Sequence, residues 1–538
     1  MSEIVSRRSF LRGTAASMAA LGALSLAGCA APSEDQTPVA DTGSWDKEAD
    51  VVIVGYGFAG ACAALAAQQG GSSVIVVEKA PEAGGNSAVS VGTIHTCIRV
   101  EDADRENYIQ KKTEGAFGTV DDDQIREFIE LEQEIPAWLE DDLGMEIVWT
   151  QKPADGTYMA NLATDDGIAN GQQLFAFFEN AAKEAGVEVL LSSPATRLVQ
   201  DPETKEIRGV VVDNNGSELT IKARKGVVLS CGGYENSPEI QANYHFPGIP
   251  FVPWGTPYNT GDGLKLAGGV GADLWHFSCF EYAGLAPKKP YEELEDHPVF
   301  TMGYNNMSFY GQDTGGSFML INKAGKRFMN ENMGIGHQKT TLPFNQFNEP
   351  VEAYVNYPFF FVCDAAVVSN GPLAPVPVYN KNKFTYAAHS PYEWSADNSA
   401  EIAKGWVIEG ETVEDLAQKI GADPANLRET IEAFNGYAES GVDEEFGRPA
   451  ETMRAFEGPF YAVECLLSVI NTMGGAKRTA HSEVVGLDGS PIPRLYSAGE
   501  FGSFNGGVLY ILGNIAEAIT SGRVAGAQVT ALDPWDAK

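Results

Sequence analysis

The sequence predicts a mixed α/β fold in which helices join parallel strands. Three observations support this prediction: an apolar, mostly β-branched run at residues 51–54, a glycine turn with an alanine-rich run at residues 55–67, and a second apolar run at residues 74–77. A continuous β-branched run is typical of a parallel strand that is buried on both faces. The expected order is therefore strand, turn, helix and strand.

The turn has the pattern G-x-G-x-x-G, formed by Gly55, Gly57 and Gly60. The first glycine permits the tight turn, the second lets the backbone approach a pyrophosphate, and the third lets the helix approach the strand closely. The helix N-terminus offers free N–H groups to the phosphates. Glu78 follows the second strand, where a carboxylate can bind both hydroxyls of an adenosine ribose. This unit predicts a dinucleotide site, and Glu78 disfavours NADP.

The first 28 residues are typical of an export signal rather than of folded structure. Arg7 and Arg8 form a twin-arginine pattern, and the apolar run after them is shorter than the roughly 20 residues that a membrane span needs. The run ends at Cys29, as in a lipoprotein cleavage box. We expect a twin-arginine lipoprotein signal at residues 1–28, a lipid on Cys29 and a polar tether at residues 29–47.

The composition argues against several other classes of protein. The formal net charge of −36 argues against binding to nucleic acid or adsorption to anionic lipid. None of the seven cysteines lies in a C-x₂-C or C-x-x-C-H motif, so we expect no zinc, haem or iron–sulfur site and no other metal site. The chain of 538 residues is long enough for two or three domains.

Further motifs lie toward both ends of the chain. They occupy residues 84–87 (GGNS), 195–198 (ATRL), 227–234 (VVLSCGGY), 259–263 (NTGDG), 472–475 (TMGG), 491–500 (PIPRLYSAGE) and 513–526. Together they resemble the flavoprotein family of fumarate reductases, succinate dehydrogenase flavoprotein subunits and 3-ketosteroid dehydrogenases. The resemblance implies FAD as the cofactor.

The glycine turn and the resemblance together predict the FAD contacts. They are Gly55, Gly57, Ala59, Gly60, Glu78, Lys79, Gly85, Asn86, Ser87, Gly92, Ala195, Gly232, Gly233, Asp262, Glu500, Asn514 and Ile515. In the family, the residue equivalent to Glu500 binds the ribityl chain, and the helix after Gly513 points its N-terminus at the flavin N1–C2=O edge. Such a helix stabilises the negative charge of a reduced flavin. Succinate dehydrogenases attach FAD to a histidine where this sequence has Asn86, so we expect non-covalent FAD.

The resemblance also implies a Rossmann-like FAD-binding domain with an inserted α+β capping domain. We expect the FAD-binding domain at residues 48–275 and 471–538, and the capping domain at residues 276–470. Residues 318–331 are close to the strand and turn that mark this family, and a helix is expected to begin near Thr412. In the family, the capping domain closes over the flavin and excludes water.

The sequence lacks the cations with which fumarate reductases bind a dicarboxylate. The proton-donor arginine is replaced by Ile335, the histidine before Thr-Met-Gly-Gly by Asn471, and another histidine by Ala283. A carboxylate that is buried without a partner is strongly disfavoured. We therefore expect that neither fumarate nor succinate is the substrate.

The candidate catalytic residues are Tyr510 and His337. Tyr510 lies just before the flavin-facing helix, in a stretch similar to the one where steroid dehydrogenases use a tyrosine to polarise a ketone. His337 lies two residues after the position of the missing arginine. A packing role for Tyr510 and a surface position for His337 remain alternatives, and Tyr282, Tyr304 or Tyr310 could also face the pocket.

These observations favour an exported FAD-dependent oxidoreductase that reduces the activated C=C bond of an enoate or enone. Hydride would pass from flavin N5 to the β-carbon, Tyr510 would bond the carbonyl, and His337 or a tyrosine would protonate the α-carbon. The alternatives are a dehydrogenase of a ketosteroid-like substrate and a lipid-anchored flavin electron carrier.

The expected partners follow from the same features. The sequence has no haem motif and no evident NAD domain, so electrons would come from a separate cytochrome or quinol-linked protein, as in anaerobic respiration. The protein would lie at the outer face of the cytoplasmic membrane or in the periplasm, and Cys29 would hold it there through the lipid anchor alone.

Overall fold

A computed structural model of the chain describes a unit that begins at Pro38, whereas the unit Met1–Thr37 lies outside the described residues. The described residues are 38–39, 43–96, 102–152, 157–165, 167–245, 249–295, 297, 300, 302, 315–331, 343–374, 378–379, 382–383, 392–506 and 513–537. The expected signal and Cys29 are therefore not described. Within the described ranges, no helix is long and apolar enough to cross a membrane.

The named helices and strands follow in chain order. They are β1 (Lys47–Val54), α2 (Phe58–Gln69), β2 (Val74–Val77), α3 (Gly85–Ala88), β3 (Ile94–Thr96), α4 (Asp102–Ala116), α5 (Asp122–Glu132), α6 (Ile135–Ala137), β4 (Ile147–Lys152), β5 (Thr157–Thr164), β6 (Gly167–Ile168), α7 (Gly171–Glu184), β7 (Glu188–Leu190), β8 (Ala195–Gln200), β9 (Ile207–Asn214), β10 (Ser217–Leu229), α8 (Pro238–Tyr244), β11 (Phe251–Pro253), α9 (Asp262–Gly269), β12 (Leu274–Trp275), β13 (Phe280–Pro287), α10 (Lys288–Glu293), β14 (Phe318–Asn322), β15 (Phe347–Asn348), β16 (Ala353–Tyr354), β17 (Phe359–Asp364), α11 (Ala365–Ser369), β18 (Val378–Tyr379), β19 (Asn382–Lys383), α12 (Ser399–Lys404), β20 (Ile408–Gly410), α13 (Val413–Ile420), α14 (Pro424–Ser440), β21 (Phe460–Thr472), β22 (Gly475–Ala476), β23 (Glu483–Val485), β24 (Pro491–Ser497) and α15 (Asn514–Thr530).

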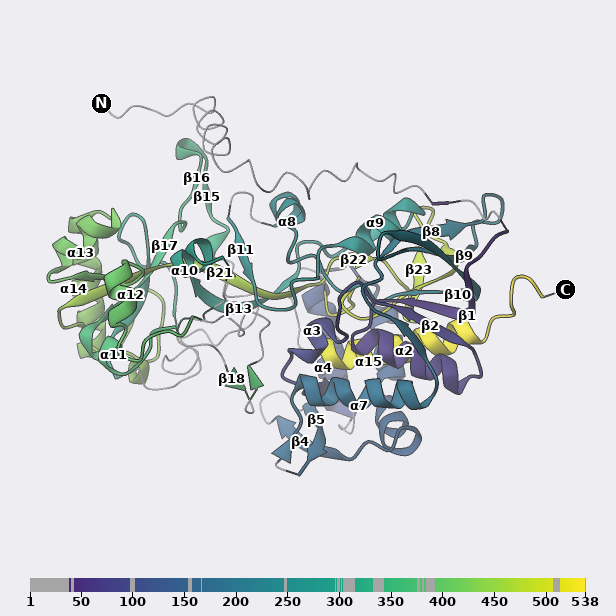
Figure 1. Cartoon of the computed structure of the whole chain (residues 1–538). Coiled ribbons are helices and arrows are strands. Elements are labelled where there is room, and N and C mark those ends of the chain that lie inside the picture. Colours follow the sequence, from purple (N-terminus) through teal and green to yellow (C-terminus); the bar gives the residue numbers. More distant parts are fainter. Residues whose placement is uncertain are drawn as a thin grey trace, which may run out of the picture. The chain divides into compact units, whose positions relative to one another are not determined.

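The first sheet is built around β1, in the strand order β23-β24-β10-β1-β2-β7. β1 pairs in parallel with β2 and β10, and β10 pairs in parallel with β24. α2 connects β1 to β2, so the predicted strand, turn, helix and strand are all present (Figure 1). Parallel strands joined by a helix confirm the mixed α/β class.

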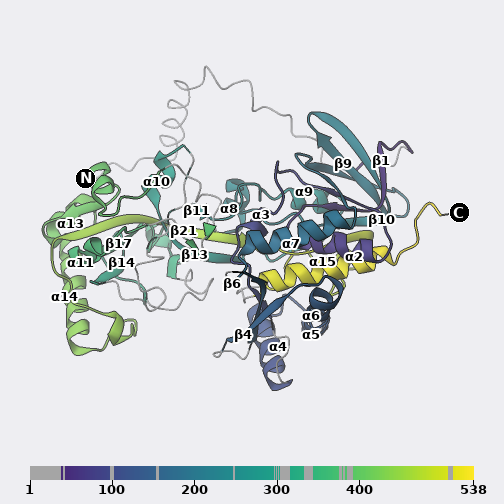
Figure 2. The same ribbon diagram turned by 60° about the horizontal axis from the view of Figure 1, so that its bottom comes forward.

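Three helices lie together on this sheet. Both views of the chain show α2, α7 and α15 side by side, although α15 comes from the far end of the sequence (Figures 1 and 2). Every residue from Phe58 to Ala67 in α2 is buried. A Cβ added at Gly526 would lie 2.3 Å from the Ala63 carbonyl oxygen, so α15 approaches the α2 backbone directly. This close approach explains why α2 is apolar on all sides.

The second sheet is mainly antiparallel and has β21 at its centre. Its order is β11-β21-β17-β14, and β13 and β20 also pair with β21. Successive residues of β14 point to opposite faces, as expected for a strand: Phe318 and Leu320 belong to one hydrophobic core, and Met319 and Ile321 to another. The strand predicted near residue 318 is therefore confirmed.

Helices α13 and α14 cover one of these faces, and side chains cap both helices. Thr412 Oγ1 accepts a hydrogen bond from the Asp415 N–H at 3.2 Å, which confirms the expected helix start. Asp423 Oδ1 accepts from the Asn426 N–H at 2.9 Å. Each cap satisfies an N–H group that the helix leaves without a partner.

A cluster of four buried charged side chains lies beside the second sheet; we call it the ion cluster (Arg327, Glu331, Asp443 and Arg448). Arg327 Nη2 lies 2.8 Å from an oxygen of Glu331 and 2.8 Å from an oxygen of Asp443. Arg448 Nη1 lies 3.3 Å from the same Glu331 oxygen. Two cations thus face two carboxylates. Burial alone would raise the pKa of Asp443, but the hydrogen bonds from Arg327 and backbone N–H groups lower it to about 2.

Candidate functional site

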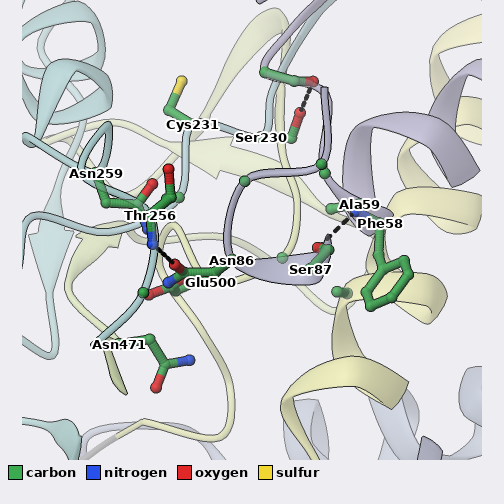
Figure 3. A pocket seen from close by; sticks show the side chains of 18 of the residues that line it. Phe58, Ala59, Asn86, Ser87, Ser230, Cys231, Thr256, Asn259, Asn471 and Glu500 are labelled. Carbon is green, nitrogen blue, oxygen red and sulfur yellow. Dashed lines mark hydrogen bonds between the residues drawn. The ribbon is translucent and has the colours of Figure 1, made fainter. Parts of the chain in front are cut away.

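A cavity of about 520 Å³ lies at the carboxyl ends of the parallel strands of the first sheet. Val54 and Val77, the last residues of β1 and β2, line it, as does Ser230 just after β10. Strands β13 and β21 of the second sheet contribute a further wall. Ligands of open α/β sheets bind at this edge of the strands. Figure 3 shows this cavity from close by.

Most of the predicted FAD contacts line this cavity. They are Gly55, Gly57, Ala59, Glu78, Lys79, Gly85, Asn86, Ser87, Ala195, Gly232, Asp262, Glu500, Asn514 and Ile515. Gly60, Gly92 and Gly233 are not among the residues that line it, and a Cβ added at any of them would meet neighbouring atoms of the protein. The sequence therefore identified segments that meet at one site, although not every glycine in them faces the cavity.

The glycine turn is compact because two of its glycines have no room for a side chain. Gly55 has φ of +101°, and a Cβ there would lie 2.2 Å from the Ser230 carbonyl oxygen. A Cβ at Gly60 would lie 2.1 Å from the Gly55 carbonyl oxygen. Only glycine fits such contacts. This geometry brings the start of α2 against the end of β1.

Two helix N-termini border the cavity. α2 begins after Gly57 and α15 after Gly513, and these N-cap glycines have no side chain with which to cap the helices. The Phe58 N–H donates to Ser87 Oγ at 2.9 Å, which ties the turn to α3. Uncapped N-termini offer N–H groups and the positive end of the helix dipole, which suits the phosphates and the anionic edge of a flavin nucleotide.

Glu78 is held in place by backbone donors. Its carboxylate accepts hydrogen bonds from the Tyr56 and Ala80 N–H groups, both at 2.8 Å. Burial raises its pKa, against the effect of these hydrogen bonds. A carboxylate has about four acceptor positions, so two backbone donors leave it able to bind ribose hydroxyls.

The cavity has little free positive charge. Among the described residues that line it, Lys79 is the only lysine or arginine. Its ammonium group donates to Thr260 Oγ1 at 2.7 Å and forms an ion pair with Asp262. The described lining therefore offers an anionic ligand no lysine or arginine whose charge is uncompensated.

Two carboxyl groups, Glu500 in the lining and Glu235 outside it, form what we call the acid pair. Glu235 is fully buried and accepts from the side-chain amides of Asn86, at 2.9 Å, and Asn259, at 2.8 Å. Thr472 joins the two acids, because its hydroxyl donates to Glu235 at 3.2 Å and its N–H donates to Glu500 at 3.0 Å. Figure 3 shows Asn86, Asn259 and Glu500 close together.

The acid pair has only neutral donors around it, and its proton affinity is correspondingly high. Burial raises the pKa of Glu235 to about 7. Burial and the neighbouring charge of Glu235 raise the pKa of Glu500 well above its usual range. Two nearby carboxyls without a counter-charge share protons rather than ionise together. The pair therefore retains a proton at neutral pH.

The second sheet contributes Glu281 and Asn471 to the cavity. The two residues lie directly opposite each other on the antiparallel strands β13 and β21, and both are buried. Asn514, the first residue of α15, donates from its side-chain nitrogen to Glu281 at 3.0 Å. No hydrogen-bond partner in the described part of the chain reaches the side-chain oxygen of Asn471 or of Asn514.

The sequence pattern did not single out Glu235 or Glu281. Glu235 follows the Gly-Gly-Tyr motif directly, and Glu281 lies two residues before the position counted for a family histidine. The sequence signal that could have identified both residues is the position of a carboxylate within two residues of a family motif position. Both candidate catalytic residues, Tyr510 and His337, lie outside the described residues.

The alternatives for the proton donor remain predictions. Tyr304 and Tyr310 are not described, and Tyr282 is described only as part of the backbone of β13. Groups of three or more histidine, cysteine or acidic residues that could hold a metal ion do not occur in the described ranges.

Comparison with known proteins identifies the class. Residues 50–508 match the model of the FAD binding domain family, so the chain belongs to this family and the resemblance inferred from its motifs is confirmed. The glycine turn, the uncapped helix N-termini and the cavity beside Glu78 fit FAD. The protein is an FAD-dependent oxidoreductase.

Individual relatives agree with this class. The chain is 27% identical to the digoxin reductase of Eggerthella lenta over 98% of each chain. It is 27% identical to the vinyl phenol reductase of Lactiplantibacillus plantarum, over 84% of this chain and 89% of the relative. The crystal structure of a 3-ketosteroid delta1-dehydrogenase from Sterolibacterium denitrificans matches 90% of this chain and all of its own length, with a TM-score of 0.74 and 21% identity, which shows a shared fold.

Proposed function

We propose that this protein is an exported FAD-dependent reductase of the activated C=C bond of an enone or enoate, and that fumarate is not its substrate. The charge of the cavity carries the proposal. Among the described lining residues, the only lysine or arginine is Lys79, which is paired with Asp262, and the lining also contains the carboxyl groups of Glu281 and Glu500. A dicarboxylate would find no compensating charge on these residues.

The relatives support a reduction of this kind. Two of them are named as reductases of digoxin and of vinyl phenol, and the second name specifies a C=C bond. Two other relatives, each also 27% identical, have fumarate in their names, so the names support a reductase, and the exclusion of fumarate rests on the charge of the cavity. We extend the shared chemistry, reduction at a C=C group, to this chain.

The roles of the residues follow from their positions. When bound, FAD supplies the hydride that reaches the β-carbon of the acceptor from N5. The uncapped N-terminus of α15 would hold negative charge at the flavin edge, and Tyr510 would bond the acceptor carbonyl as negative charge develops there. His337 or a tyrosine would protonate the α-carbon.

The two sheets correspond to the two domains that we assign to the protein. We assign the first sheet to a Rossmann-like FAD-binding domain and the second to an inserted capping domain, close to the predicted residues 276–470. β11, at Phe251–Pro253, also belongs to the second sheet, which therefore begins before residue 276. The capping domain would exclude water from the reacting carbon.

Export and electron supply complete the proposal. The twin-arginine pattern at Arg7 and Arg8 and the lipidation box at Cys29 would deliver a folded, FAD-loaded protein to the outer face of the cytoplasmic membrane. A membrane cytochrome or quinol-linked protein would then supply electrons. Changing both arginines to lysine should keep the precursor inside the cell, and fractionation would show it.

Reoxidation of the reduced flavin tests the function. The purified holoprotein is reduced photochemically without oxygen and mixed with benzalacetone, cinnamate or fumarate, while flavin absorbance is followed. We expect rapid reoxidation by the enone or the enoate and none by fumarate. Equal rates with fumarate would contradict the proposal. Reduction of the oxidised holoprotein's flavin by a saturated ketone, without reoxidation of the reduced flavin by any alkene, would favour the dehydrogenase alternative.

Tyr510 provides a second test. Tyr510→Phe should lower kcat about 10²–10³-fold, as expected for the loss of one donor to developing negative charge, while FAD content stays normal. Near-normal turnover in this variant would assign Tyr510 a packing role.

A further inference from the structure

The two carboxyl groups of the acid pair meet at Gly233, at the edge of the cavity. Glu500 lines the cavity, and Glu235 is fully buried outside the lining. A Cβ added at Gly233 would lie within 2.7 Å of both Glu235 Oε2 and Glu500 Oε1, so these two oxygens border one small space. Thr472 bonds the same two oxygens, through its hydroxyl and its backbone N–H. A change of charge at one carboxyl group therefore acts on the other at short range.

The described charged and titratable groups around the acid pair do not neutralise it. Burial raises the pKa of Glu500, and the neighbouring charges of its pair partner and of Glu281 on β13 raise it further. Tyr234 donates its hydroxyl to a backbone carbonyl at 2.6 Å and stays neutral, because burial raises its pKa as well. Arg478 bonds the carbonyls on either side of Glu500, but its charge is paired with a carboxylate of α15.

Reduction of the flavin adds negative charge to the same cavity. Two electrons and one proton leave one negative charge on the ring, which the start of α15 is expected to stabilise. Lys79, the only lysine or arginine among the described lining residues, is already paired with Asp262. A nearby negative charge raises the proton affinity of a carboxyl group. The acid pair can therefore compensate the added charge by binding a proton.

We propose that the acid pair binds one proton when the flavin is reduced and releases it when the flavin is reoxidised. Two electrons from the separate donor protein and one proton go to the flavin, and a second proton goes to the pair. When the electron pair leaves as hydride, together with the hydrogen at N5, the acid pair gives up its own proton. The site thus takes up and returns two electrons and two protons, which matches the addition of hydride and a proton to a C=C bond.

The number of protons released on reoxidation tests the inference. The holoprotein is reduced photochemically without oxygen, desalted, and reoxidised at about pH 8 with ferricyanide, which accepts electrons but no protons. An indicator dye counts the protons released per flavin. The flavin alone accounts for one. Wild type should release more than one and approach two, because the pKa of Glu235 before reduction is about 7. A count of one would overturn the inference.

Variants assign the second proton to the pair. Glu235→Gln combined with Glu500→Gln keeps the size of both side chains, removes both acids and should release one proton. The matched control Glu239→Gln, at an exposed position on α8, should release as many as wild type. Two protons from the double variant would mean that another group binds the second one and would overturn the inference. Loss of this proton in Glu281→Gln, but not in the double variant, would do the same.

The midpoint potential gives a second reading on wild type, which stands even if the double variant loses FAD. Each proton taken up changes the equilibrium constant tenfold per pH unit, which is about 30 mV for a two-electron couple. Below about pH 6 the pair is already protonated, so the potential should fall by about 30 mV per pH unit. Above about pH 7 the slope should steepen toward about 60 mV per pH unit. A slope that stays constant, or that is steeper on the acid side, would contradict the inference.

These measurements are independent of the proposed function. Ferricyanide and an electrode replace the alkene, so the proton count and the potential decide the role of the acid pair even if no alkene reoxidises the flavin. If enones reoxidise the flavin but wild type releases a single proton, the proposed function stands and the inference is wrong.

Discussion

The ion cluster and the acid pair both contain buried carboxyl groups, but the charges of these groups are compensated differently. In the ion cluster, Arg327 and Arg448 face Glu331 and Asp443, and charged hydrogen bonds join them. In the acid pair, the donors to Glu235 and Glu500 are amides, a hydroxyl and a backbone N–H, all of them neutral. One cluster lies beside the antiparallel sheet and the other beside the cavity.

This difference separates a structural role from a functional one. Hydrogen bonds from Arg327 and from backbone N–H groups lower the pKa of Asp443 to about 2. Its carboxylate therefore stays ionised at neutral pH and stabilises the folded state. Unpaired acids do the reverse, and burial raises the pKa of Glu235 to about 7, where protons exchange near neutral pH. Strongly perturbed acids beside a cavity are typical of functional sites.

The largest effect is expected from breaking the ion cluster. Glu331→Gln leaves two buried arginines with one carboxylate, and it should lower the free energy of unfolding by about 3–5 kcal/mol. Denaturant unfolding of the holoprotein measures the change. Glu429→Gln removes the partner of Lys326 in an exposed ion pair and should cost less than about 1 kcal/mol. A similar loss in both variants would contradict the comparison.

The acid pair should make the free energy of unfolding depend on pH. Because the pKa of Glu235 is raised in the folded state, folding favours its protonated form. The contribution of Glu235 to the free energy of unfolding is therefore fully present below about pH 4.5 and is lost as the pH rises toward 7. The shift corresponds to about 3 kcal/mol. Glu235→Gln should flatten the fall in unfolding free energy between pH 4.5 and 7.

The control for this prediction is Glu239→Gln, which changes an exposed residue near the pair in sequence. This control should keep the wild-type slope. If Glu235→Gln and wild type show the same slope, the acid pair does not hold the proton that we assign to it.

The smallest of the three effects should appear in acid. The pKa of Asp443 is lowered to about 2, so its stabilising contribution is present above about pH 4 and is lost as the pH falls toward 2. The shift corresponds to about 2 kcal/mol. The difference in stability between wild type and Asp443→Asn should therefore shrink on acidification from pH 5 to pH 2.5. A constant difference would show that the charge of Asp443 is not what stabilises the fold.

The parts that sequence predicted well are those set by local chain geometry. Rules about neighbouring residues predict the apolar run before Gly55, the glycine turn and the alanine-rich helix. In the structure these are β1, the turn and α2. The helix that begins after Thr412 follows in the same way. Such patterns do not depend on contacts with distant parts of the chain.

The parts that sequence did not predict depend on pairing between distant segments. Glu235 is significant because Asn86 and Thr472 meet it, and Glu281 because β21 places Asn471 opposite it. No local pattern specifies the register between β13 and β21, which contains two irregularities near this point. The catalytic assignments of Tyr510 and His337 stay predictions, since neither residue is described.

The contact between α15 and α2 has a consequence for the biosynthesis of the protein. The cavity is lined by residues from Val54 to Ala518, so the two ends of its wall are far apart in the sequence. The site therefore cannot close on a nascent chain until α15 has left the ribosome, and non-local closure of this kind is slow. We expect FAD to be incorporated only after α15 has been synthesised, which makes cofactor binding depend on the last segment that lines the cavity.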